Sequence, residues 1–175
     1  MKIKKKTTKL SNYVKKKTKT VFFKKKKKIY HSFKQSDYVS ILAITKNKKI
    51  LLVKQYRPAI EKFTLEIPGG LIDGKERHSR AAKRELTEET GYIAKKLVYL
   101  GSFYPDVGRL ENKIYCYYAK NVQISKNFKK EEGLEIFEVS FTELKNLIKK
   151  NKIQHFLHIG IIGLAKLKNL INIKL

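Results

Sequence analysis

One segment restricts the fold of this chain more than any other: the stretch "GGLIDGKERHSRAAKRELTEETGY" at residues 69–92, rich in glycine and glutamate. Its pattern predicts a loop followed by a helix from about residue 79 to 90, with Gly91 as the left-handed residue that ends it. On that helix Glu85, Glu88 and Glu89 project from one side, because residues three and four positions apart are neighbours. Carboxylates held so close repel one another, so the segment calls for a source of positive charge.

Arg84 is the nearest such source, and it precedes Glu88 by four residues. We therefore expect Arg84 and Glu88 to pair, which would leave Glu85 and Glu89 free. Free carboxylate oxygens suit a hard divalent cation, either Mg²⁺ or Mn²⁺. The glycines before the helix would let a ligand approach the main chain closely. A solvated acidic helix face is the alternative interpretation of the same charges.

The segment also resembles the signature of the Nudix hydrolases, and it matches that signature at every specified position. The pattern is a glycine and a glutamate followed by the run Arg-Glu-apolar-any-Glu-Glu-any-Gly-apolar, where the last apolar position tolerates a tyrosine. The matching residues are Gly70, Glu76, Arg84, Glu85, Leu86, Glu88, Glu89, Gly91 and Tyr92.

Resemblance to that family implies an α/β fold, the Nudix α/β/α sandwich with a mixed sheet. It implies hydrolysis of a nucleoside diphosphate linked to another moiety, with divalent ions neutralising the diphosphate oxygens and acidifying water. The metal ligands that it implies are Glu85, Glu89, Glu88 and the carbonyl group of Gly69. The structural or orienting residues that it implies are Arg84, Gly70, Glu76 and Gly91.

The segment before this signature, "VKQYRPAIEKFTLEIPGG", resembles the ADP-ribose and nucleotide-sugar pyrophosphatases within the family. By that resemblance Arg57 contacts the diphosphate, and Glu66 contacts the nucleotide or the metal region. A guanidinium group suits this task because it pairs bidentately with phosphate oxygens. A surface arginine without a ligand is the alternative for Arg57.

Two later loops carry the remaining candidate residues. The loop "YPDVGRLEN" resembles the region that sets substrate preference, but Val107 stands where many ADP-ribose enzymes have proline, which leaves other nucleoside diphosphate sugars open. In it, Tyr104 is a candidate for stacking on a base or sugar and Arg109 for reaching a phosphate, unless both only hold the loop. The acidic run "KKEEGLEIF" offers Glu132, or else Glu131, as a catalytic base on a mobile loop.

The rest of the chain reads as a mixed sheet packed between helices. Strands are expected at 38–45, 50–56, 97–104, 113–120 and 134–140, because these runs are rich in β-branched and aromatic residues. Ser140 and Glu143 fit a capping box that opens a helix to about residue 150, and a last helix is expected at about 154–168. Ala82 and Leu86 form an apolar edge of the mid-chain helix for packing on the sheet.

The N-terminal 36 residues differ sharply in charge from the remainder. They contain 15 lysines and no acidic residue, in a chain whose formal net charge is +26. We divide the chain into a lysine-rich extension, 1–36, and a Nudix domain, 37–175. Residues 1 to about 17 read as a solvated tail, and "KTVFFKKKKKIYHSF" as a short hairpin. The extension suits a phosphate-bearing partner such as nucleic acid or anionic lipid, although a general bias toward lysine explains it as well.

Few other features point to chemistry or to a compartment. Cys116 lies in the apolar run "IYCYYA" and is interpreted as core, and the four histidines show no ligand or triad pattern. No apolar stretch approaches the roughly 20 residues of a membrane span, and no secretory signal is recognisable, so the cytoplasm is the expected location. Resemblance to the subfamily also implies a homodimer.

The function expected from these observations is Mg²⁺-dependent cleavage of ADP-ribose or a related nucleoside diphosphate sugar to a nucleoside monophosphate and a sugar phosphate. Two alternatives come from the lysine-rich extension. One is a Nudix enzyme that acts on RNA 5′ ends, and the other is a basic nucleic-acid-binding protein on a Nudix scaffold. The complete glutamate set argues against the last of these.

Overall fold

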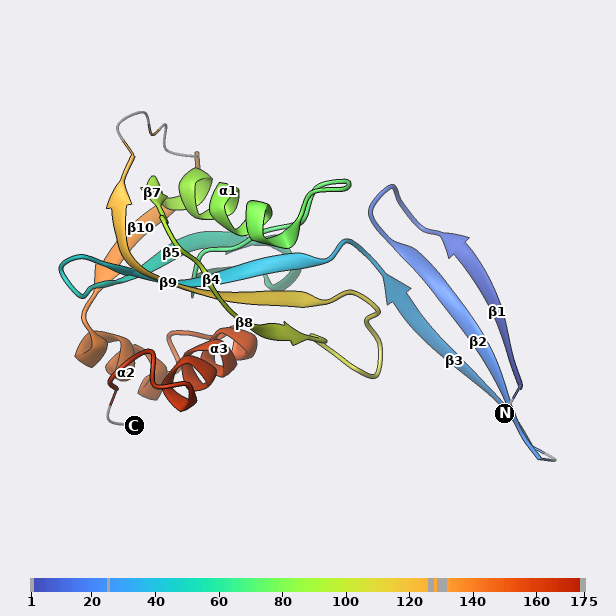
Figure 1. The fold of residues 1–175 in the computed structure, drawn as a ribbon. Coiled ribbons are helices and arrows are strands. Elements are labelled where there is room, and N and C mark those ends of the chain that lie inside the picture. The colour runs from blue at the N-terminus through green and yellow to red at the C-terminus, as the bar shows by residue number, and fades with distance from the viewer. Residues whose placement is uncertain (1, 25, 126–127, 129–131, 174–175) are drawn as a thin grey trace. The chain divides into compact units, whose positions relative to one another are not determined.

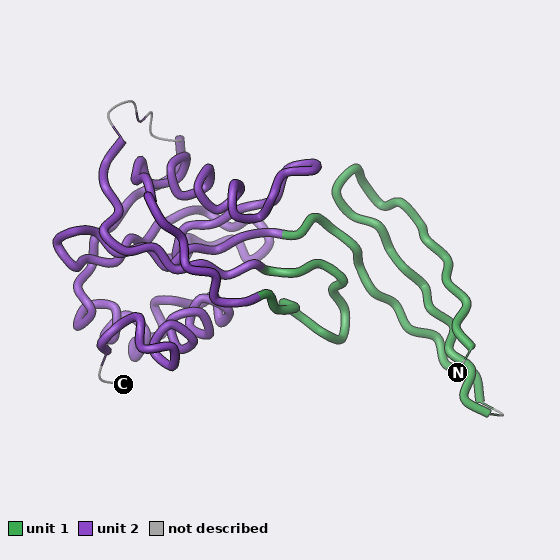
Figure 2. The backbone as a smooth tube through the Cα atoms, viewed as in Figure 1, with its two compact units in different colours: residues 1–37, 102–114 green, residues 38–101, 115–175 purple. Residues whose placement is uncertain are grey.

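The computed structural model describes residues 2–24, 26–125, 128 and 132–173. The chain divides into two compact units (Figure 2). The first unit comprises Met1–Asp37 and Ser102–Ile114, and the second comprises Tyr38–Gly101 and Tyr115–Leu175.

A seven-stranded sheet forms the centre of the second unit. Its strands run in the order β10-β5-β4-β9-β7, with β6 paired to β5 and β8 paired to β9. Strand β4 is buried along almost its whole length, as expected of a central strand covered on both faces. The strand bounds are β4 (Tyr38–Thr45), β5 (Ile50–Arg57), β6 (Lys62–Glu66), β7 (Tyr92–Ile93), β8 (Val98–Phe103), β9 (Ile114–Ile124) and β10 (Glu135–Val139).

Helices cover both faces of this sheet (Figure 1). Helix α1 (His78–Thr90) lies on one face, and α2 (Phe141–Lys149) and α3 (Phe156–Leu167) lie on the other; a short 3-10 helix, η1 (Pro58–Ile60), follows β5. Ala82 and Leu86 of α1 are completely buried against residues of β4, β5 and β9, so the predicted apolar edge is confirmed. The arrangement is the α/β/α sandwich with a mixed sheet that the sequence predicted.

The helix ends follow the local signals in the sequence. Gly91 has φ +72° and its N–H donates to the carbonyl of Thr87, so it is the predicted left-handed residue. The hydroxyl of Ser140 accepts from the N–H of Glu143, whose carboxylate accepts from the N–H of Ser140, which confirms the capping box. Both motifs satisfy backbone groups that the helix itself leaves unpaired.

A separate three-stranded antiparallel sheet forms most of the first unit. Its strands are β1 (Lys2–Lys9), β2 (Lys15–Phe23) and β3 (Lys26–Lys34), in that order. The predicted hairpin is present as β2 and β3, but the prediction of a solvated tail for residues 1–17 is wrong, because β1 pairs with β2 along its whole length. The outer edge of β3 is joined by backbone hydrogen bonds between Phe33 and the segment 109–111.

Among the helices of the described residues, none combines the length and apolarity needed to cross a membrane.

Helix α3 contains glycines whose replacement by a larger residue should stabilise the protein. A side chain at Gly160 would meet no atom within 4 Å, and glycine destabilises a helix interior by about 1 kcal/mol relative to alanine. We expect Gly160→Ala to raise the free energy of unfolding by roughly 0.5–1 kcal/mol in urea titrations. The matched opposite is Gly91→Ala, which should destabilise, because φ is positive there and a Cβ would overlap the ring of Phe128. A loss of stability in Gly160→Ala would contradict the helical assignment.

Candidate active site

The loop before α1 is held against the central strand by backbone hydrogen bonds. The N–H of Val39 donates to the carbonyl of Gly70 (2.9 Å), and the N–H of Ile41 donates to the carbonyl of Pro68 (2.8 Å). Gly69 lies so close to β4 that a Cβ there would overlap the carbonyl oxygen of Val39. The main chain of the loop is therefore fixed in place, with no room for side chains at this point.

Two glycine–glutamate contacts join this loop to α1. The N–H of Gly69 donates to Glu89 Oε2 at 2.8 Å, and Glu89 is only 7% exposed. A Cβ at Gly70 would overlap the carboxylate of Glu85. The structure thus brings together Gly69, Gly70, Glu85 and Glu89, which the sequence predicted as parts of one site.

Arg84 is the centre of the charge network on α1. Its Nη1 donates to Glu85 Oε1 (2.7 Å) and to Glu88 Oε2 (2.8 Å), and its Nη2 donates to Glu76 Oε2 (3.1 Å). The predicted pair with Glu88 is confirmed, and the bond to Glu76 is a further contact that the sequence did not predict. The expectation that Glu85 stays free of Arg84 is wrong, because the guanidinium fork reaches both carboxylates at once.

Burial and the neighbouring charges act on the protonation of Glu85. Burial, together with the negative charges of Glu88 and Asp73, raises the pKa of Glu85 against the opposing effect of Arg84. Within the described residues, the oxygens of Glu85, Glu88 and Glu89 do not all gather within 4.8 Å of one another. Arg84 bonds only Oε1 of Glu85 and only Oε2 of Glu88, so each of these carboxylates keeps an oxygen of the kind that a divalent cation prefers as a ligand.

A second ion pair lies at the end of β6, just before the same loop. Arg57 Nε and Nη2 donate to the two carboxylate oxygens of Glu66 at 2.7 and 2.8 Å, and the hydroxyl of Thr64 donates to Oε1 at 2.5 Å. Glu66 is 3% exposed, whereas the side chain of Arg57 is 43% exposed. Burial alone would raise the pKa of Glu66, but the bonds from Arg57 and Thr64 lower it to about 2.

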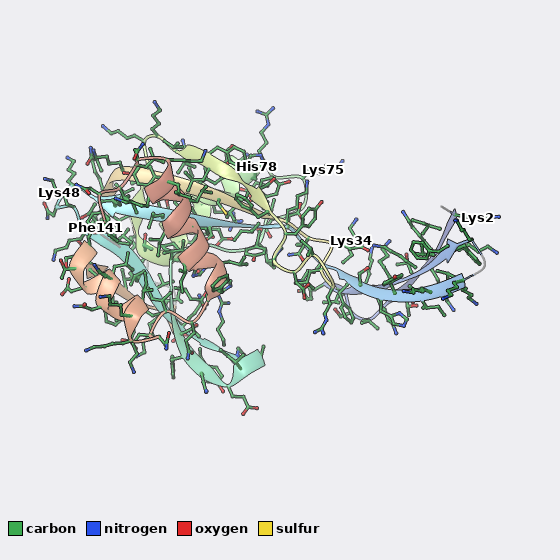
Figure 3. All side chains as sticks on the ribbon, turned by 90° about the horizontal axis from the view of Figure 1, so that it is seen from below. Lys2, Lys34, Lys48, Lys75, His78 and Phe141 are labelled. Atoms are coloured by element: carbon green, nitrogen blue, oxygen red, sulfur yellow. The ribbon has the colours of Figure 1, made fainter. Side chains whose placement is uncertain are left out.

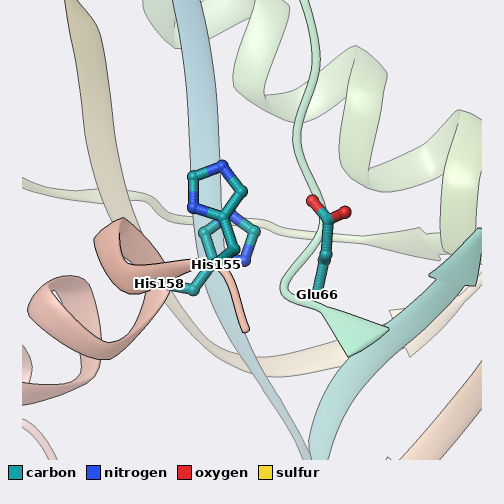
Figure 4. A group of neighbouring side chains, drawn as sticks. All are labelled: Glu66, His155 and His158. Carbon is teal, nitrogen blue, oxygen red and sulfur yellow. The ribbon is translucent and has the colours of Figure 1, made fainter. Parts of the chain in front are cut away.

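Two histidines of the α3 region, His155 and His158, lie beside Glu66 (Figure 4), a proximity that the sequence pattern does not indicate. The rings of His155 and His158 are stacked with centroids 4.1 Å apart, and the N–H of Ile67 donates to His158 Nδ1 at 3.3 Å. Burial lowers the pKa of His158 to about 3 and also lowers that of His155, so both rings are neutral at pH 7.

One candidate ligand atom from each of Glu66, His155 and His158 lies within 4.8 Å of the others. A metal there would have to displace Arg57 from Glu66. It would also disrupt the bond from Ile67, because a ring that binds metal through Nε2 carries a proton on Nδ1. We therefore interpret the histidines as packing that holds Ile67 and the loop after it, not as a metal centre.

Four further residues were predicted to belong to the site: Tyr104, Arg109, Glu132 and Glu131. Tyr104 and Arg109 belong to the first unit, where Lys113 Nζ lies 5.6 Å from the Tyr104 ring centroid and the carbonyl of Arg109 accepts from Phe33. Glu132 is exposed in the turn before β10, and Glu131 lies outside the described residues. The substrate-binding and base roles of these residues stay predictions.

Cys116 takes no part in this chemistry. It is buried in β9, and burial raises the pKa of its thiol to about 12. A thiol in such surroundings is a poor nucleophile, so the interpretation of Cys116 as core is confirmed.

Comparison with known proteins identifies the family of this chain. Two relatives are an ADP-ribose pyrophosphatase of Bacillus subtilis, 32% identical over 118 residues, and a methanol dehydrogenase activator of Bacillus methanolicus, 35% identical over 118 residues. Each alignment covers 66% of this chain and 64% of the relative, so the chain spans just under two thirds of their lengths. A solved structure described as an ADP compounds hydrolase superimposes with a TM-score of 0.81 at 20% identity, covering 95% of this chain and 90% of that one. The model of the NUDIX domain matches residues 34–158, and the chain therefore belongs to the Nudix family.

Proposed function

We propose that this protein hydrolyses the diphosphate of a nucleoside diphosphate sugar, ADP-ribose or a relative, to a nucleoside monophosphate and a sugar phosphate. The observation that carries the proposal is the pair of contacts that seat Glu89 on Gly69 and Glu85 on Gly70. The activity in the name of the Bacillus subtilis relative supports the same reaction.

Glu85, Glu89 and Glu88 would hold the metal, together with the carbonyl of Gly69, and Mg²⁺ or Mn²⁺ suits these oxygen ligands. The bound ion would supply neutralisation of the diphosphate oxygens and polarisation of water. Arg84 would orient the carboxylates of Glu85 and Glu88, to which it donates hydrogen bonds of 2.7 and 2.8 Å.

Other residues of the chain would bind the substrate and move the proton. Glu66 fixes the guanidinium of Arg57 through Nε and Nη2, and the Arg57 side chain is 43% exposed, so Arg57 would present a fixed positive charge to a substrate phosphate. Water adds to one phosphorus, the bridging P–O bond breaks, and the proton of the water passes to Glu132, or else to Glu131. Tyr104 and Arg109 are the proposed contacts to the sugar or base and to a phosphate.

The substrate within this class is open to a direct test. The methanol dehydrogenase activator is as similar as the ADP-ribose enzyme, so similarity alone does not choose the base or the sugar. A panel of ADP-ribose, other ADP-sugars, UDP-sugars and GDP-mannose, assayed with Mg²⁺ and with Mn²⁺, should give a nucleoside monophosphate and a sugar phosphate from at least one substrate. If folded protein, verified by circular dichroism, cleaves none of them, the proposed reaction is wrong.

A second candidate function is cleavage at RNA 5′ ends, and the lysine-rich sheet of the first unit is the observation that favours it. Capped or triphosphorylated RNA belongs in the same panel.

We also propose that the N-terminal lysines contact nucleic acid and that the protein is a homodimer in the cytoplasm. Sedimentation at several protein concentrations tests the dimer, and a reducing compartment suits a chain with a single cysteine.

A further inference from the structure

The sheet formed by β1, β2 and β3 concentrates lysine where β structure tolerates it poorly. Lys9, Lys15 and Lys34 lie directly opposite one another across the three strands, and Lys5 lies directly opposite Lys19. Side chains in such positions share a face of the sheet and lie a few ångströms apart. Like charges directly opposite one another destabilise a sheet, so these rows work against the fold that contains them.

Acidic residues compensate little of this repulsion. Glu111 is 2.5 Å from Lys19 and accepts a hydrogen bond from Ser32, both within the first unit. No ion pair links Lys9, Lys15 or Lys34 to an acidic residue in the described part of the chain. Protection of an exposed strand edge explains lysines on β1, but not those on β2, which lies between the other two strands.

Lysine side chains extend from both faces of the sheet (Figure 3). The cross-strand register places Lys5, Lys9 and Lys15 on one face, and Lys4 and Lys16 on the other. A flat anionic membrane can contact only one face of a sheet at a time, so the lysines of the second face would add little to such binding. The distribution suits an extended polyanion that is able to run along either face.

Aromatic side chains are exposed among these lysines. Tyr30 is 47% exposed and lies in the same cross-strand row as Lys19 and Lys5, and Phe23 is 45% exposed at the end of β2. Single-stranded nucleic acids bind where lysines follow the backbone phosphates and aromatic rings stack on unpaired bases.

We propose that this sheet is a binding surface for single-stranded nucleic acid, with the row Lys9–Lys15–Lys34 as a phosphate contact and Tyr30 as a stacking platform. The phosphates would remove the repulsion that the rows create. The proposal concerns the first unit alone and is independent of the hydrolysis proposed for the second.

Fluorescence anisotropy with a labelled single-stranded RNA of about twenty nucleotides tests this proposal on the full chain, at salt concentrations between about 50 and 200 mM. The variant replaces Lys9, Lys15 and Lys34 with glutamine. The matched control replaces three exposed lysines of the second unit, Lys149, Lys150 and Lys152, with glutamine as well. It therefore removes the same net charge as the row variant. Each lost phosphate contact lowers the slope of log K against log salt by about 0.7, so the row variant should lose about two, with binding at least tenfold weaker at low salt.

The control should keep its slope, and Tyr30→Ala should weaken RNA binding about fivefold or more without changing the slope. Thermal melts of the row variant should show no loss of stability, because its cross-strand repulsion is relieved. Equal effects of the row and control variants would overturn the proposal, since net charge alone would then explain the binding. Binding to phosphatidylserine vesicles without binding to RNA would also overturn it, and would make the sheet a membrane contact.

Discussion

Replacing Glu89 with glutamine should reduce the rate of nucleotide-sugar hydrolysis by at least about a hundredfold while leaving the protein folded. Loss of a group that only supports a metal ligand typically reduces activity by about 10–100-fold, so loss of the charge on a ligand itself should do more. The fold should survive because glutamine keeps a side-chain oxygen that can accept the N–H of Gly69, now 2.8 Å from Glu89 Oε2. The measurement is kcat/KM on the best substrate of the panel, with thermal melts of the same preparations.

The matched control is Glu143→Gln, which removes the same charge from an exposed glutamate in the cap of α2. Its hydrolysis rate should match that of the unmodified protein, with a small loss of stability from the weakened cap. A second comparison titrates the metal, because a lost ligand should raise the concentration of Mg²⁺ or Mn²⁺ required for half-maximal rate. Full activity in Glu89→Gln at ordinary metal concentration would exclude Glu89 as a ligand.

The loop and helix of the site were predictable because their determinants are local. The spacing of three glutamates, the arginine one turn before Glu88 and the glycine that ends the helix are all visible within two dozen residues. The burial of Ala82 and Leu86 followed from the same periodicity. The contact of Arg84 with its neighbour Glu85 was not visible, because adjacent residues on a helix do not face each other and only the length of the arginine side chain brings them together.

Contacts between distant segments were harder to predict. His158 accepts a hydrogen bond from the N–H of Ile67, which is 91 residues away in the sequence. The spacing of three residues between His155 and His158 does not indicate a partner in another element. Strand β1 was missed for a different reason. Its lysines and threonines give no alternation of apolar and polar residues, so its pairing with β2 depends on backbone hydrogen bonds that leave no hydrophobic pattern.

Replacing Arg57 with alanine should remove about 2 kcal/mol of stability at pH 7, and this loss should disappear in acid. The folded-state pKa of Glu66 is about 2, below its ordinary value of 4.5, so its ionised form is favoured by folding. That difference corresponds to about 3 kcal/mol, and solvent screening of the half-exposed Arg57 lowers the expected effect to about 2. The contribution is complete above pH 4.5 and is lost as the pH falls toward 2.

Urea titrations of both proteins from pH 7 to pH 2 measure this effect, and the difference between their free energies of unfolding should narrow steadily below pH 4.5. The matched control is Lys54→Ala on the same strand, where Lys54 Nζ lies 2.8 Å from an exposed carboxylate oxygen of Glu135. An exposed pair contributes less than about 1 kcal/mol, so this variant should change little at any pH. In kinetic assays of folded protein, Arg57→Ala should also raise KM at least about tenfold if Arg57 contacts a substrate phosphate as proposed. A stability difference that stays constant from pH 7 to pH 2 would mean that Arg57 supports the fold by packing and that the charge of Glu66 is held by other groups.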